Sequence, residues 1–272
     1  MRLLVALVTL FAVVGAAAPA AAQSGEIVGR TELRVCADPN NLPFSNEKQE
    51  GFENKIASLL GDELKLPVTY TFFPQIIGFV RNTLRARSCD LIMGTLVGDD
   101  IVQTTNPYYY SAYVAVFPKE KGFTFTGFDD PRLKTMRIGI VGATPPSNLL
   151  VSHDLMAQAR PYALTVDTRF ESPAHQLIED LAAGELDIGF VWGPIAGYYV
   201  QREKLPLGFA ALPEEPGAPR MDYRIAMGVR ANEPEWRRRI NAAILKRQPE
   251  ITQILRDYGV PLLDERGQLL PP

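Results

Sequence analysis

The spacing of apolar residues over positions 31–94 alternates between the patterns of strands and helices. From residue 51 to 64, apolar side chains recur every three or four positions, as on the buried face of a helix. The apolar runs on either side are short and bounded by Asn, Pro and Gly, which is typical of buried strands. The pattern predicts strands at 31–37, 67–73 and 90–94 and helices at 51–64 and 74–85, the second helix burying Ile77.

The same order of elements returns between residues 136 and 191. It predicts strands at 136–141, 163–168 and 187–191, a loop at 142–148, and helices at 149–159 and 173–183. Residues 84–92 and 181–189 each end a helix, turn, place an Asp and start a strand, which indicates one unit used twice. Strands at 111–117 and 223–229 then connect the two units, and a helix over 233–259, broken near Pro249, ends the chain.

This order predicts an α/β fold of two lobes, each an open and mostly parallel sheet, joined by two hinge crossings with a cleft between them. The first lobe is expected to hold residues 23–117 and 220–272, and the second lobe residues 118–219. Open α/β sheets bind ligands beyond the carboxyl ends of their strands. The loops 38–46 and 142–148 are therefore expected to face the cleft.

Residues 1–22 have the pattern of a secretory signal peptide. A basic start is followed by an apolar run over 3–14 and by small residues up to Ala22, where cleavage is expected. A membrane anchor is the alternative, but the apolar run is short for a membrane span. Removal of these 22 of the 272 residues leaves 250, and loss of Arg2 takes the net charge from −3 to −4. The mature protein is expected to be periplasmic.

Composition and charge narrow the function classes. Lys and Arg number 28 against 31 Asp and Glu, so the chain lacks the basic surface of a nucleic-acid binder. Two Cys and two His are too few for a Cys-rich or His-rich metal site, and no cofactor-binding motif is present. The two histidines, His153 and His175, show no sign of converging. We therefore expect no catalytic residues, no metal and no cofactor.

Cys36 lies within a predicted strand, and Cys89 directly precedes another. In an oxidising compartment two cysteines usually pair, and neighbouring strands would bring these sulfurs together. Two buried free thiols are the alternative. The disulfide would close a loop of about fifty residues, which stabilises the fold by about 4 kcal/mol in the chain-entropy model.

Several segments, taken in order, resemble the type II periplasmic solute-binding proteins of family 3. They are Pro43-Phe44 after the first strand, Gly51-Phe52-Glu53 at the first helix, the run 89–95, the run 105–109 and the run 137–140. The resemblance covers nearly the whole mature chain. It implies a periplasmic-binding-protein-like fold and a binding function.

A narrower resemblance is carried by the runs 34–46, 51–57, 78–84 and 89–94. They are similar to the quinoprotein-dehydrogenase-associated members of this family, the MxaJ/XoxJ proteins. That resemblance implies a non-catalytic accessory protein in methylotrophy, which assists maturation or activation of a periplasmic PQQ-dependent methanol dehydrogenase. The dehydrogenase, alone or together with its cytochrome, is the implied partner.

Two positions depart from the pattern of amino-acid receptors in the family. Those receptors usually carry an Arg after the third strand for the ligand carboxylate, but here Thr95 is followed by Asp99 and Asp100. They also place an Asp after a strand of the second lobe, where this chain has Trp192. A free amino acid would lose both charged partners, so the cleft is not expected to be an amino-acid site.

The candidate cleft or partner-binding residues come from the strand-end loops and from aromatic positions. Asp99 and Asp100 are either a solvated loop or a metal-binding or acid/base pair. The tyrosines either line the cleft or face a partner, or they belong to core and rim packing. The full set is Asn40, Asn41, Pro43, Phe44, Asn46, Thr95, Asp99, Asp100, Tyr108, Tyr109, Tyr110, Gly142, Thr144 and Trp192.

Three classes of function remain open from the sequence. The first is the dehydrogenase accessory protein. The second is a solute receptor of an ABC-type transporter for a small molecule other than a free amino acid. The third is an enzyme on the same fold, for which no convergent acid and base groups are legible.

Overall fold

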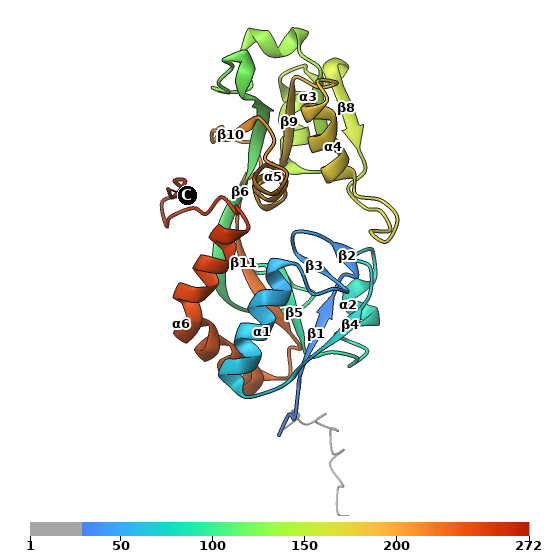
Figure 1. Ribbon diagram of the computed structural model, residues 1–272, viewed down its shortest axis with the longest axis vertical. Coiled ribbons are helices and arrows are strands. Elements are labelled where there is room, and N and C mark those ends of the chain that lie inside the picture. Colours follow the sequence, from blue (N-terminus) through green and yellow to red (C-terminus); the bar gives the residue numbers. More distant parts are fainter. Residues whose placement is uncertain (1–28, 272) are drawn as a thin grey trace, which may run out of the picture.

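The computed structural model describes residues 29–271, and Figure 1 shows two lobes joined by one long strand, β6 (Gln103–Pro118). The expected signal peptide at 1–22 lies outside the described residues. Lobe I contains β1 (Leu33–Ala37), the hairpin β2 (Asn40–Asn41) and β3 (Ser45–Asn46), α1 (Phe52–Leu64), β4 (Val68–Phe72), α2 (Phe79–Asn82), β5 (Leu91–Leu96), β11 (Asp222–Val229) and α6 (Pro234–Asp257).

Lobe II is built from the middle of the chain. It contains β7 (Ile138–Val141), α3 (Pro145–Ser152), β8 (Ala159–Tyr162), α4 (Pro173–Ala182), β9 (Ile188–Trp192), α5 (Gly193–Arg202) and β10 (Leu207–Ala211), with short 3₁₀ turns at Lys119–Lys121, Pro131–Thr135 and Met156–Gln158. Across the described residues, no helix combines the length and apolar character needed to cross a membrane.

Hydrogen bonding is continuous between the lobes because both half-sheets share β6. The strand order is β4-β1-β5-β11-β6-β9-β7-β8, and β10 also pairs with β6. β1 is parallel to β4 and β5, and β7 is parallel to β8 and β9, whereas β6 is antiparallel to its neighbours. The predicted two-lobed α/β fold of the type II binding proteins is confirmed.

The core of lobe I follows from the helical spacing in the sequence. Phe52, Ile56 and Leu60 recur every four residues on α1, and each is fully buried. α6 covers the same core and contributes the fully buried Trp236. These two helices lie side by side against the sheet (Figure 1). Lobe I is therefore formed by two segments that are far apart in the sequence.

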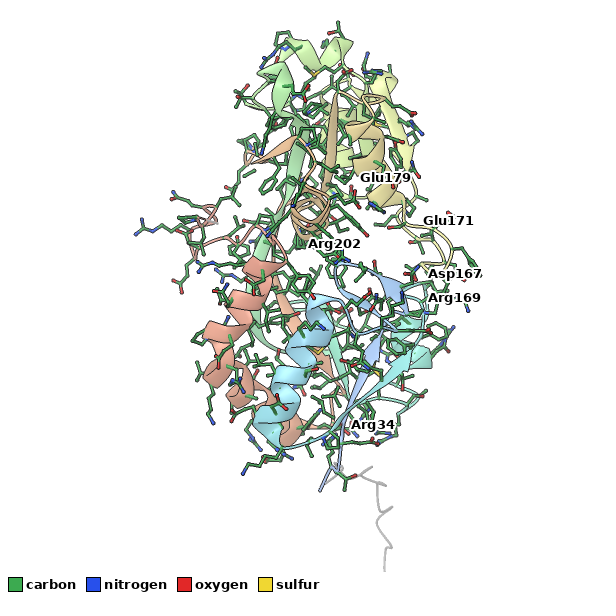
Figure 2. The ribbon with its side chains drawn as sticks, in the orientation of Figure 1. Arg34, Asp167, Arg169, Glu171, Glu179 and Arg202 are labelled. Carbon is green, nitrogen blue, oxygen red and sulfur yellow. A yellow bond between two sulfur atoms is a disulfide. The ribbon has the colours of Figure 1, made fainter. Side chains whose placement is uncertain are left out.

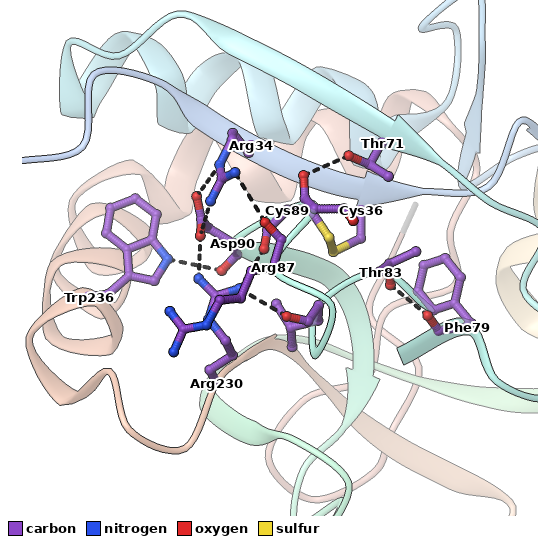
Figure 3. Close-up of a disulfide and its surroundings, with 12 residues drawn as sticks. Arg34, Cys36, Thr71, Phe79, Thr83, Arg87, Cys89, Asp90, Arg230 and Trp236 are labelled. Atoms are coloured by element: carbon purple, nitrogen blue, oxygen red, sulfur yellow. Dashed lines mark hydrogen bonds and ion pairs between the residues drawn. A yellow bond between two sulfur atoms is a disulfide. The ribbon is translucent and has the colours of Figure 1, made fainter. Parts of the chain in front are cut away.

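Cys36 and Cys89 form the predicted disulfide, shown in Figure 3. β1 and β5 are neighbouring parallel strands, with Cys36 opposite Ile92. This register brings the two Cα atoms to 5.4 Å, and both cysteines are buried. The crosslink therefore joins two strands that already form the centre of lobe I.

Asp90, next to the disulfide, is the most heavily paired acid in the described chain (Figure 3). Arg34 donates to both of its carboxylate oxygens at 2.7 and 2.8 Å, and Arg230 donates to one of them. The Trp236 indole donates to the Asp90 carbonyl at 3.0 Å. Burial alone would raise the pKa of Asp90, but the hydrogen bonds from Arg34 and Arg230 hold it below its usual value.

The internal repeat is visible in the same contacts. In lobe II, Arg137 donates to both oxygens of Asp187 at 3.0 Å, as Arg34 does to Asp90 in lobe I. In each lobe the Asp amide also bonds the carbonyl of that Arg. The lobe II pair is more open to solvent, since 55% of the Arg137 side chain is exposed. The unit that the sequence repeats is therefore an Arg–Asp pair that connects two neighbouring strands. The pair is largely buried in lobe I and more exposed in lobe II.

Two predicted elements in the first half of the chain differ from the structure. The helix expected at 74–85 is only the short α2, and Ile77 is 91% exposed. Gly78 takes a left-handed backbone conformation (φ 95°), which breaks the apolar stripe before it can form a continuous helix.

Two elements of lobe II are also shifted from the prediction. The helix expected at 149–159 begins at Pro145, inside the loop predicted at 142–148, and ends at Ser152. Asp154 then takes a left-handed conformation (φ 55°) that turns the chain. The strand expected at 163–168 therefore lies at Ala159–Tyr162, where it pairs with β7.

The break expected near Pro249 is absent, and α6 runs unbroken over 24 residues. Proline removes the hydrogen bond to the carbonyl four residues earlier, here that of Leu245. Pro249 is exposed and Leu245 is 80% exposed, so solvent can satisfy this carbonyl. The helix tolerates Pro249 because it lies on the solvent face.

The repeated Arg–Asp joint gives a matched comparison of buried and exposed ion pairs. Asp90→Asn weakens the pairing of two buried arginines, Arg30 and Arg230, and of the partly exposed Arg34, and is expected to lower the free energy of unfolding by about 3–5 kcal/mol. Asp187→Asn removes the more exposed pair and is expected to cost about 1 kcal/mol or less. Urea unfolding followed by circular dichroism measures both, and equal losses in the two variants would contradict this assignment.

Candidate functional site

A cavity of about 530 Å³ lies between the two lobes. From lobe I it is lined by the β2–β3 hairpin, the start of α1, the end of β5 and β11. From lobe II it is lined by the end of β9, the start of α3 and the segment 163–174. Its position beyond the carboxyl ends of β5, β7 and β9 agrees with the general rule for open α/β sheets.

Seven of the fourteen candidate residues line this cavity. Phe44 and the hairpin residues come from the loop after β1, and Thr95 from the end of β5. Thr144 and Trp192 reach it from lobe II, at the ends of β7 and β9. The seven are Asn40, Asn41, Phe44, Thr95, Tyr109, Thr144 and Trp192.

Three residues of the strand-end loops support the cavity without lining it. Pro43, in the turn of the hairpin, and Asn46, on β3, are both buried. The Asn46 side chain accepts from the Glu50 amide at 2.8 Å and donates to the Glu50 carboxylate at 2.8 Å, which fixes the loop against α1. The Gly142 amide donates to the Tyr162 carbonyl at 2.8 Å.

The other four candidates are not part of the cavity lining. Tyr108 is buried in the lobe I core, and Tyr110 donates to Asp222 near the hinge. The Asp99 carboxylate accepts the backbone amide two residues later at 2.9 Å, and Asp100 is exposed. The Asp99 carboxylate also accepts the hydroxyl of the cavity-lining Thr95 at 2.9 Å. Whether any of them contacts a partner stays a prediction.

The two histidines are far from forming a pair. His153 Nε2 lies 2.8 Å from Glu215 in lobe II, and the hydrogen bond that the imidazole donates to that carboxylate holds the pKa of His153 above its usual value. His175 stacks on Tyr199 with ring centroids 3.7 Å apart. Within residues 29–271, no group of three or more His, Cys, Asp or Glu side chains is placed to hold a metal.

Three aromatic side chains form a cluster at the hinge side of the cavity. The rings of Tyr113 and Trp192 lie edge to face with centroids 5.1 Å apart, and Tyr223 lies 6.1 Å from Trp192. Tyr113 and Trp192 are direct partners across the β6–β9 ladder. Tyr223 was not among the sequence candidates, although the return strand that carries it was predicted.

Glu53 is the residue that the sequence analysis named only as part of a motif. It is the second residue of α1, is 4% exposed and lines the cavity. No hydrogen bond from any of the described residues contributes to the pKa of its carboxyl. Burial, and then the charge of Asp38, raise the pKa of Glu53 from 4.5 to about 8. An empty cavity at neutral pH therefore favours the protonated acid.

The cavity is spanned by a contact between the lobes that involves Asp38 and Thr168. The Thr168 hydroxyl lies 2.7 and 2.9 Å from the Asp38 carboxylate oxygens, and Asn40 donates to the Thr168 carbonyl at 2.8 Å. Figure 2 shows the loop that carries Thr168, between the labelled Asp167 and Arg169, reaching from lobe II toward lobe I. We call this contact the interlobe latch.

Asp38 is fully buried and is fixed from lobe I as well. Its carboxylate accepts the amides of Asn40 at 2.9 Å and Gln75 at 2.7 Å. The latch therefore joins a loop of lobe II to an already ordered acceptor, which lowers the entropic cost of closing the lobes. Thr168 could not be identified from the apolar pattern, because its segment was expected to be a strand.

Comparison with known proteins places these features in a family. The sequence pattern of the bacterial extracellular solute-binding proteins, family 3, matches residues 33–260. Protein MoxJ of Methylorubrum extorquens is 28% identical over 246 residues, covering 85% of this chain and 81% of that protein.

Two solved structures are similar over most of the chain. The periplasmic binding protein XoxJ from Methylobacterium extorquens AM1 is 42% identical with a TM-score of 0.72, covering 86% of this chain and 100% of that chain. MxaJ from Methlophaga aminisulfidivorans MPT is 30% identical with a TM-score of 0.74, covering 85% of this chain and 100% of that chain. The resemblance to the MxaJ/XoxJ proteins expected from the sequence is confirmed.

The unpartnered carboxyl of Glu53 predicts a pH dependence of stability. Between pH 4.5 and about 8 the folded protein keeps a proton on Glu53 that the unfolded chain releases, so the wild type loses stability as the pH rises through this window. Glu53→Gln does not titrate, and it is expected to be more stable than the wild type at pH 8, by on the order of 3 kcal/mol, and similar at pH 4.5.

Thermal unfolding across this pH range measures the effect. Tyr70, Tyr108, Tyr109 and Asp38 face the same carboxyl and are unchanged in the variant. Glu47→Gln, an exposed acid on the same lobe, is the control and should follow the wild type. A Glu53→Gln curve parallel to the wild type would show that Glu53 does not hold the extra proton.

Loss of the interlobe latch should open the cavity. Thr168→Val keeps the shape of the side chain and removes the hydroxyl that lies against Asp38, a bond to a charged group worth about 1.5–3 kcal/mol. Small-angle scattering should report a larger radius of gyration. Thr165→Val, on the exposed part of the same loop, should leave the radius unchanged. An unchanged radius in both variants would mean that the latch does not set the closure.

Proposed function

This chain belongs to the family 3 bacterial extracellular solute-binding proteins, and from that membership we propose that it is a periplasmic, non-catalytic accessory protein. Its role is to assist maturation or activation of a PQQ-dependent methanol or alcohol dehydrogenase. The observation that carries the proposal is the similarity to XoxJ and MxaJ, which extends over 86% and 85% of the chain. The segment 1–22 supplies the export signal in this proposal.

The composition of the cavity supports a binding role other than amino-acid capture. No Lys, Arg or His is found in its lining, as far as the described residues show, so an α-carboxylate would meet no cation there. Trp192 occupies the lobe II strand end where an amino-acid receptor would need an acid. Burying both charges of an amino acid without partners would cost several kcal/mol.

The proposed contact is an extended segment of the dehydrogenase that enters the cavity from its open side. Phe44, Tyr109 and Trp192 offer aromatic surface, which anchors interfaces because rings bury a large area with few rotatable bonds. Backbone groups of the loops 40–46 and 142–147 would hold the segment. A net charge of −4 suits a partner with a basic patch, which speeds encounter more than it tightens binding.

A second candidate is a solute receptor of an ABC-type transporter. The interlobe latch favours it, because closure of two lobes over a cavity is how a receptor retains a small ligand. If the protein is a dehydrogenase accessory protein, the cell needs it to activate the enzyme. If it is a receptor, the cell needs it for uptake of a small molecule. A deletion strain separates the two.

Deletion of the gene is expected to lower active dehydrogenase while the dehydrogenase polypeptide remains present. Complementation with Trp192→Ala should restore less activity than the wild type, because the aromatic cluster loses its central ring. Phe209→Ala removes a half-exposed ring on β10 outside the cavity and should complement fully. Dehydrogenase activity and immunoblots of periplasmic extracts provide the readout. Full activity in the deletion strain would refute the accessory role.

A further inference from the structure

The charged side chains that line the interlobe cavity are all acidic, as far as the described residues show. Glu53 and Glu171 both line it, and Asp38 lies close enough to Glu53 to raise its pKa. The lining within residues 29–271 contains no cationic side chain. Anionic ligands are therefore repelled, and a cation is the charged group that this cavity can stabilise.

Glu53 is placed to receive such a group. Its side chain is almost completely buried and lines the cavity, and none of the described residues contributes a hydrogen bond to the pKa of its carboxyl. Gly94 makes room for it, because a Cβ at that position would come within 2.5 Å of Oε1. A buried carboxyl without a partner is costly, and in water-filled space it attracts either a proton or a cation.

The aromatic lining has the same preference. The face of an aromatic ring carries negative charge density and attracts ammonium groups. Tyr113, Trp192 and Tyr223 form one cluster, and Phe44 and Tyr109 line the lobe I side. The acid supplies the counter-charge, and the rings supply a surface that accepts both an ammonium group and an apolar chain.

We propose that the cavity binds a protonated alkylamine that carries an apolar body and no carboxylate, with its ammonium group against Glu53. The cavity volume of about 530 Å³ lies within the range found for small-molecule sites. Because the smallest amines would fill only a fraction of this volume, the ligand requires an apolar body. The amine is either a free molecule or the side chain of a lysine in an extended partner segment. The inference rests on the cavity being the functional site, as in the proposed function.

Binding is coupled to a proton. In the empty cavity burial keeps a proton on Glu53 at neutral pH, since its pKa is raised to about 8. An ammonium group favours the carboxylate, so the acid releases its proton to the buffer when the amine binds. Affinity is therefore expected to rise as the pH increases from 7 to 8, while the amine itself remains protonated.

Isothermal calorimetry at pH 7 tests this with defined probes. Hexylamine is compared with 1-hexanol, and acetyl-Ala-Lys-Ala-amide is compared with the same peptide carrying norleucine. At least one amine should bind tenfold or more tightly than its uncharged counterpart, equal to about 1.4 kcal/mol. Its apparent enthalpy should differ between phosphate and Tris, because their heats of protonation differ.

Two variants decide whether Glu53 is responsible. Glu53→Gln should remove both the tenfold preference and the buffer dependence while the protein remains folded. Glu47→Gln, an exposed acid outside the lining, should retain both. Preference for the lysine peptide identifies a partner segment as the source of the amine, and preference for hexylamine identifies a free amine.

The proposal is overturned if neither amine binds, if the uncharged probes bind equally well, or if Glu53→Gln keeps the preference. That failure would leave a dehydrogenase defect in the deletion strain intact, so it is distinguishable from failure of the proposed function. The opposite combination is also informative. If an amine binds through Glu53 but the deletion strain keeps its dehydrogenase activity, this inference is retained and the receptor role is favoured.

Discussion

Strand β6 is the constraint on which the arrangement of the two lobes depends, because both half-sheets are hydrogen-bonded to it. Its first half pairs with β11 in lobe I, and its second half with β9 and β10 in lobe II. Backbone groups of a buried ladder cannot separate without losing their partners. Relative motion of the lobes must therefore bend this ribbon. Tyr113 lies on β6, and Trp192 and Tyr223 lie on the neighbouring strands β9 and β11, so the aromatic lining responds to any change in closure.

Three buried carboxyl groups of lobe I serve three different purposes, which depend on their hydrogen-bond and charge partners. Asp90 is surrounded by arginines and ties the strands beside the disulfide together. Asp38 is satisfied by two backbone amides and by Thr168, so it connects the lobes. Glu53 has no partner among the described residues and borders the cavity. A fully paired acid contributes to structure, whereas an unpaired acid in a cavity is available to a ligand.

The sequence predicted what depends on local pattern and failed where tertiary contacts decide. Cys36–Cys89, the two lobes and the cavity position of Trp192 followed from strand order and from what ends each strand. The helix expected at 74–85 failed because the left-handed Gly78 interrupts an otherwise apolar stripe. Helix α5 and strand β10 were missed, since their pairing with β6 and packing are not local properties. The contact of Thr168 with Asp38 and the position of Glu53 at the cavity depend on how distant segments are arranged around the cleft. The spacing of apolar residues carries no information about this arrangement.

Hydrogen–deuterium exchange of this chain, alone and with the purified apo-dehydrogenase, tests most directly whether the interlobe cavity is the surface through which the protein acts. The account predicts slower exchange at amides of 40–46 and 163–174, which line the two sides of the cavity, and no change on the exposed face of α6. Protection confined to α6, or to another surface away from the cavity, would contradict it.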